Sequence, residues 1–95
     1  MSTGTQALVR LGYEQITSLS SATGLTVPAG ASLALVTPAS KSVRWRDDGT
    51  NPSSTVGYPL NVGDELQYDA ANLGAIKFIE TAASATLDVV YYGQK

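Results

Sequence analysis

Apolar residues alternate with polar ones in many short stretches of this chain, and no stretch repeats with the 3.6-residue period of a long helix. The clearest stretch is residues 85–92, where Leu87, Val89 and Tyr91 would share one face. Successive side chains of a strand point to opposite faces of a sheet, so strict alternation is typical of strands. The pattern predicts an all-β protein.

Turn residues such as Pro, Gly, Asn and Asp separate the apolar stretches at intervals of about 8–12 residues. Seven or eight short strands at this spacing favour a β-sandwich of the jelly-roll or a related Greek-key type. The expected strands are residues 13–20, 25–27, 31–37, 42–47, 58–60, 64–68, 75–80 and 85–92.

A weak internal similarity agrees with this fold. Shifting the chain by 33 positions places Gly30 on Gly63 and Trp45 on Phe78. Alternating strands also match one another by chance, so both a structural repeat and a coincidence stay open.

The first twelve residues begin polar and become apolar towards their end. We expect residues 1–12 to form an N-terminal arm or an edge strand, and residues 13–95 to form a single domain. The arm could fray, as termini often do. It could instead dock onto a neighbouring subunit through Leu8, Val9 and Leu11.

Residues 42–50 (SVRWRDDGT) hold the only tryptophan. In a strand, Trp45 shares a face with Val43, which predicts a core position for the indole. The alternative is an exposed aromatic platform that binds sugars, extended by tyrosines.

Arg44 and Arg46 would occupy the opposite face of that strand. Two planar guanidinium groups side by side suit bidentate pairing with the carboxylates of a partner. The alternative is a solvated face on which the arginines pair with Asp47 or Glu80.

A second candidate contact surface comes from the last strand. Val90 and Tyr92 lie on its outward face, and Ile79 is apolar on the outward side of the strand before it. Apolar patches on the surface of a small domain often mark contacts with partners. We therefore expect these three residues to contribute to an interface.

The composition argues against catalysis. The chain has no His and no Cys, so it lacks the usual proton shuttle, the usual thiol nucleophile and any thiolate metal site. No phosphate-binding glycine motif or zinc spacing occurs. We expect no enzymatic activity, no cofactor and no metal.

Charge and hydropathy narrow the class of partner. The net charge is −2, so no basic surplus is present to bind nucleic acid. No apolar run approaches the ~20 residues that cross a bilayer, and no signal-peptide pattern opens the chain. Ninety-five residues without a disulfide bury a modest core, which favours association with copies of the same chain or with a larger scaffold.

Several segments, over roughly residues 33–91, resemble small structural proteins encoded by tailed bacteriophages. The segments are residues 43–52 (VRWRDDGTNP), 57–60 (GYPL), 63–64 (GD), 68 (Y) and 76–79 (IKFI).

The resemblance implies a non-enzymatic virion protein, made in the cytoplasm of a bacterial host. Its nearest role is that of a capsid decoration, or cement, protein that binds the major capsid protein of the assembled head and stabilises the shell. A tail or neck component is the competing role within the virion. From the residues alone, a carbohydrate-binding adhesion module is the alternative of a different class.

Overall fold

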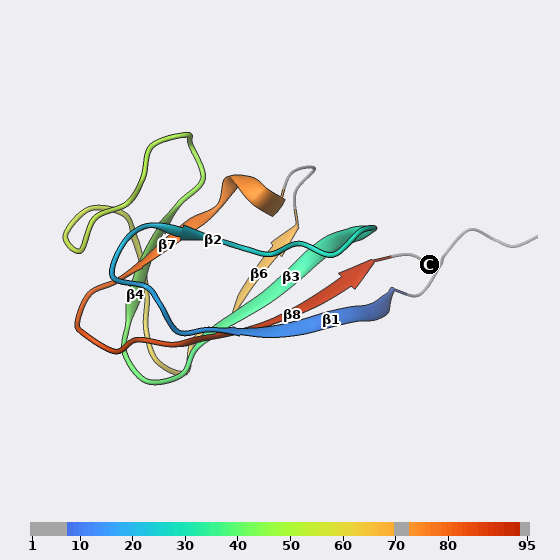
Figure 1. Cartoon of the computed structure of the whole chain (residues 1–95), viewed down its shortest axis with the longest axis horizontal. Helices are drawn as coiled ribbons and strands as arrows, with labels where there is room; N and C mark the ends of the chain where they lie inside the picture. Colours follow the sequence, from blue (N-terminus) through green and yellow to red (C-terminus); the bar gives the residue numbers. More distant parts are fainter. Residues whose placement is uncertain (1–7, 70–72, 94–95) are drawn as a thin grey trace, which may run out of the picture.

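Eight strands and one short 3₁₀ turn make up the regular structure of the computed structural model, which describes residues 8–69 and 73–93 (Figure 1). No helix in this described part is long and apolar enough to cross a membrane. The elements are β1 (Val9–Ile16), β2 (Thr23–Gly24), β3 (Ala31–Pro38), β4 (Val43–Arg46), β5 (Tyr58–Leu60), β6 (Leu66–Asp69), η1 (Leu73–Ala75), β7 (Lys77–Glu80) and β8 (Leu87–Gly93).

The strands form two antiparallel four-stranded sheets. The first sheet has the order β1-β8-β3-β6, and the second has the order β2-β7-β4-β5. The pairs β1·β8, β2·β7, β3·β6 and β4·β5 are nested one inside the next. The prediction of an all-β sandwich is confirmed, and the jelly-roll or related Greek-key type stays a prediction.

Alternating side chains from both sheets fill the space between them. In β8 every second residue is buried, beginning with Leu87, which confirms the face predicted for this strand. Phe78 of β7 and Val43 of β4 face them from the second sheet and are fully buried. The core consists of Ile16, Leu19, Ala34, Val36, Val43, Leu60, Leu73, Ile76, Phe78, Ala85, Leu87, Val89 and Tyr91.

The N-terminal part of the described chain differs in detail from the expectation. β1 begins at Val9 and forms the edge of the first sheet, so the strand crosses the boundary that we placed after residue 12. Residues 1–7 of the expected arm lie outside the described residues.

The second strand was predicted at the wrong place. β2 is Thr23–Gly24, which the turn-forming composition of residues 21–24 concealed, and these two residues pair with Phe78 and Lys77. Residues 25–27 are not a strand, and the Thr26 amide donates to the Glu14 carboxylate at 2.9 Å. Tertiary contacts with β1 and β7 therefore override the local sequence preference.

The last residue of β8 requires the absence of a side chain. A Cβ atom on Gly93 would lie 2.1 Å from the carbonyl oxygen of Gly30 and 2.8 Å from a methyl carbon of Leu11. The Gly30 atom belongs to the backbone, and the partly buried Leu11 packs against the core, so the backbone contact in particular cannot be relieved without cost.

We expect Gly93→Ala to lower the free energy of unfolding by about 2–3 kcal/mol, because it overpacks this junction. Denaturant unfolding of the full chain measures the effect. Gly12→Ala is the matched control, since its Cβ would meet Pro28 at an ordinary 3.7 Å. Equal stability of the two variants would show that the Gly93 junction is not tightly packed.

Candidate functional site

Strand β4 presents its arginines on the outer face of the second sheet, as the alternation predicted. Val43 is fully buried on the inner face, and the next residue, Arg44, lies beside Ile79 of the neighbouring strand β7. However, the loop of residues 47–57 folds back against this outer face. Pro52 in that loop is buried, and a Cβ on Gly57 would lie 3.1 Å from the Cβ of Arg44.

Arg44 holds this loop in place. Its Nε donates to the carbonyl oxygen of Ser54 at 3.2 Å, and its Nη1 donates to the carbonyl oxygen of Gly57 at 2.9 Å. The loop closes on itself through reciprocal backbone bonds between Ser53 and Val56. The guanidinium of Arg44 therefore binds backbone of its own chain.

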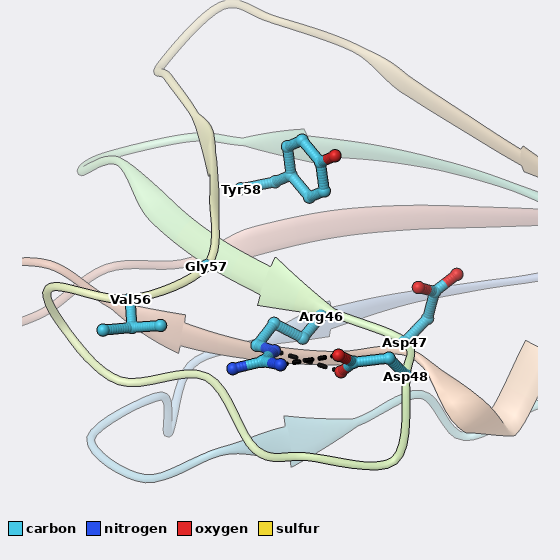
Figure 2. Close-up of a pocket in the computed structure, with 6 residues that line it drawn as sticks. All are labelled: Arg46, Asp47, Asp48, Val56, Gly57 and Tyr58. Atoms are coloured by element: carbon cyan, nitrogen blue, oxygen red, sulfur yellow. Dashed lines mark hydrogen bonds and ion pairs between the residues drawn. The ribbon is translucent and has the colours of Figure 1, made fainter.

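Arg46 is also paired within the chain. Its Nε and Nη2 donate to the two carboxylate oxygens of Asp48 at 3.0 and 2.5 Å, a bidentate ion pair (Figure 2). These bonds to Arg46 lower the pKa of Asp48 below its ordinary value. We had expected Asp47 or Glu80 as the alternative partner of the arginines, and the partner of Arg46 is Asp48.

A shallow cavity of about 420 Å³ lies where β4 ends and β5 begins. In Figure 2 the Asp47 side chain points away from the ion pair of Arg46 and Asp48. Its carboxylate accepts a hydrogen bond from the Tyr68 hydroxyl at 2.8 Å. The two neighbouring carboxylates thus have separate partners and do not converge on one point. The cavity is lined by Arg46, Asp47, Asp48, Val56, Gly57 and Tyr58.

Trp45 forms the centre of an aromatic cluster at the edge of the sandwich. Its ring stacks on Tyr58 with centroids 5.2 Å apart and meets the edge of Tyr68 at 6.2 Å. The indole packs against the core, as predicted, but it is only partly buried. Tyr58 is 68% exposed. The cluster is therefore neither fully buried nor an open row of aromatic rings.

The other candidate surface lies on the outer face of the first sheet. Val90 and Tyr92 of β8 pair with Leu35 and Leu33 of β3, and all four side chains point away from the core. We call these four residues the apolar strip. Tyr13 of β1 flanks the strip and is 59% exposed.

The strip contains two of the predicted contact residues and excludes a third. Val90 and Tyr92 lie side by side on it. Ile79 lies on the outer face of the second sheet, opposite Arg44, and so does not join them. The sequence of the predicted strand 31–37 does not tell which of its faces is outward, because Leu33 and Leu35 alternate with Ala34 and Val36, which are apolar too.

The three predicted contact residues of the N-terminal arm differ in their exposure. Leu11 packs against the core. Leu8 and Val9 are 42% and 37% exposed at the start of β1. Only these two of the three residues are available to a partner.

Within residues 8–69 and 73–93, no three Asp or Glu side chains lie together in a group that could bind a metal ion. No family model, curated protein or solved structure matches this chain.

We expect Arg44→Met to release the loop of residues 47–57, because methionine keeps an apolar stem and removes both donors. Two hydrogen bonds from a charged group are lost, so unfolding should require about 1–3 kcal/mol less free energy. Hydrogen exchange of the Ser53 and Val56 amides should accelerate. Arg46→Met is the control and should have a smaller effect on this loop. Equal exchange in both variants would contradict the role of Arg44.

The pKa of Tyr68 is raised to about 12, first by partial burial and second by its bond to Asp47. Because the folded pKa lies above the ordinary 10.0, this hydroxyl stabilises the fold fully below pH 10 and loses that effect as the pH rises towards 12.

We therefore expect Tyr68→Phe to be less stable than the parent at pH 8, with a difference that narrows between pH 10 and 12. Unfolding curves of the two proteins across this range measure it. A difference that does not change with pH would contradict the raised pKa of Tyr68 in the folded protein.

Proposed function

We propose that this chain is a non-enzymatic structural protein of a tailed-phage virion, which binds the assembled head as a decoration protein. One observation carries the structural role: the described part of the chain presents large apolar side chains on two separate surfaces, the exposed Leu8 and Val9 at the beginning of the first sheet and the half-buried apolar strip. A small domain gains from burying such surfaces against protein. The resemblance of residues 43–52 to phage structural proteins supports the virion as the location of this protein.

The proposed mechanism is linkage by mass action. A protein that binds the assembled shell but not the separate subunits stabilises the shell by its own binding free energy. Many copies together then oppose dissociation by heat or internal pressure. No chemical step is required, which agrees with a sequence that lacks His and Cys.

The proposed contact with the shell is the start of β1. Leu8 and Val9 are apolar and exposed there. The arginines of β4 are weaker candidates than the sequence suggested, because Arg44 and Arg46 already bind groups of their own chain. A partner would have to displace those contacts first.

The experiment mixes the protein with assembled heads of the encoding phage, and separately with unassembled capsid protein, and sediments both. We expect it to co-sediment with the heads only and to raise their temperature of disruption. Electron microscopy of the particles should place it on the head, and a position at the neck or tail would favour the alternative virion role.

The double variant Leu8→Ser with Val9→Ser should bind the heads at least about tenfold more weakly, because two apolar contacts are lost. Val62→Ser is the matched control, since Val62 is 51% exposed in a turn. Unchanged binding of the double variant would refute this contact, and no binding of the parent would refute the decoration role.

A carbohydrate-binding adhesion module is the second candidate. The observation that favours it is the exposed ring of Tyr58 stacked on Trp45, since sugars bind to exposed aromatic faces. Retention of the parent, but not of Tyr58→Ala, on immobilised bacterial surface polysaccharides would support this function over the first.

A further inference from the structure

The apolar strip and its edges form two straight rows across the first sheet. One row runs Arg10, Tyr92, Leu33, Asp69 from β1 to β6, and the other runs Tyr13, Val90, Leu35, Gln67. In both rows the apolar residues occupy the two central strands. The polar or charged ends lie on the edge strands.

The first row carries opposite charges at its two ends. Arg10 lies beside Tyr92, to whose hydroxyl it donates at 3.2 Å, and its guanidinium is 5.8 Å from the centre of that ring. Asp69 is exposed at the other end. Within the described residues, neither of these two charges forms an ion pair.

This arrangement is complementary to itself. A two-fold axis between β8 and β3, parallel to the strands, would lay one first sheet over that of a second copy. β1 of each copy would then face β6 of the other, so Arg10 would meet Asp69 twice. A two-fold axis perpendicular to the strands would instead place β1 of one copy over β1 of the other, and β6 over β6, so Arg10 would not meet Asp69.

We propose that two copies of this chain pack their first sheets face to face about the two-fold axis parallel to β8 and β3. Leu33, Leu35, Val90 and Tyr92 of both copies form the centre of the interface, and the pairs of Arg10 with Asp69 set its orientation. Two aligned sheets that pack in this way lie about 10 Å apart. The proposal goes beyond shell binding, because it concerns the protein in the absence of a shell.

The expected dimer is weak. The four strands have 8, 7, 8 and 4 residues, and at about 3.3 Å per residue and about 4.8 Å between strands they give a face of roughly 430 Å², so two faces bury about 900 Å². Stable complexes bury about 1,200–2,000 Å². We therefore expect a dissociation constant between about 10 µM and 1 mM.

The experiment is analytical ultracentrifugation of the full chain at low ionic strength, up to about 1 mM protein, where charge pairs are least screened. Leu35→Glu places a charge beside the axis and should weaken the dimer by more than about 30-fold. Val62→Glu makes the same charge change in an exposed turn and should leave the dimer unchanged. Circular dichroism and thermal unfolding verify that each variant folds.

The charges test the orientation. Arg10→Asp and Asp69→Arg should each weaken the dimer about 5- to 30-fold, because each places like charges opposite one another. The double variant Arg10→Asp with Asp69→Arg restores complementarity and should return to within about threefold of the parent. The edge charges are exposed, so this series remains informative if Leu35→Glu does not fold.

Each result decides the proposal. A parent that stays monomeric at every concentration overturns it, and so does a dimer that tolerates Leu35→Glu. A double charge variant as weak as the single variants overturns the orientation. Shell binding is measured separately, so a dimer without shell binding would refute the decoration role and leave this inference intact.

Discussion

The structure depends on the insertion of β8 between β1 and β3. This strand, near the end of the chain, pairs on one side with the first strand and on the other with the third. Its inner residues Leu87, Val89 and Tyr91 are fully or almost fully buried. The first sheet is therefore complete only when distant parts of the chain have met, which makes folding cooperative and non-local.

The outer face of the second sheet is covered by a loop of the same chain. β4 and β5 are neighbours in this sheet, and the long loop of residues 47–57 that joins them folds back onto the sheet. Arg44 supplies donors for two of its carbonyl groups, which would otherwise depend on water. An arginine that looks like an interface residue in the sequence thus serves as an anchor for a loop.

Periodicity predicted the parts of the fold in which one face differs clearly from the other. Residues 85–92 are the best case, since burial alternates along β8. It could not decide the outward face of β3, because Leu33 and Leu35 alternate with Ala34 and Val36, and all four are apolar. The bonds of Arg44 and the short strand β2 depend on tertiary contacts that no local pattern contains.

The width of the apolar strip follows from the order of the strands. β8 and β3 are central in the first sheet and are apolar on the inner face and, over Val90, Tyr92, Leu33 and Leu35, on the outer face as well, where the next pair is Asp88 and Thr37. The outer faces of the edge strands carry Arg10 and Tyr13 on β1, and Gln67 and Asp69 on β6. Charged and polar residues on the edge strands confine the apolar strip to the two central strands and discourage open-ended edge-to-edge association of sheets. Such a surface favours a closed contact with one partner of matching width. A second copy of the same sheet has that width by symmetry, and its Arg10 and Asp69 fall opposite Asp69 and Arg10 of the first copy.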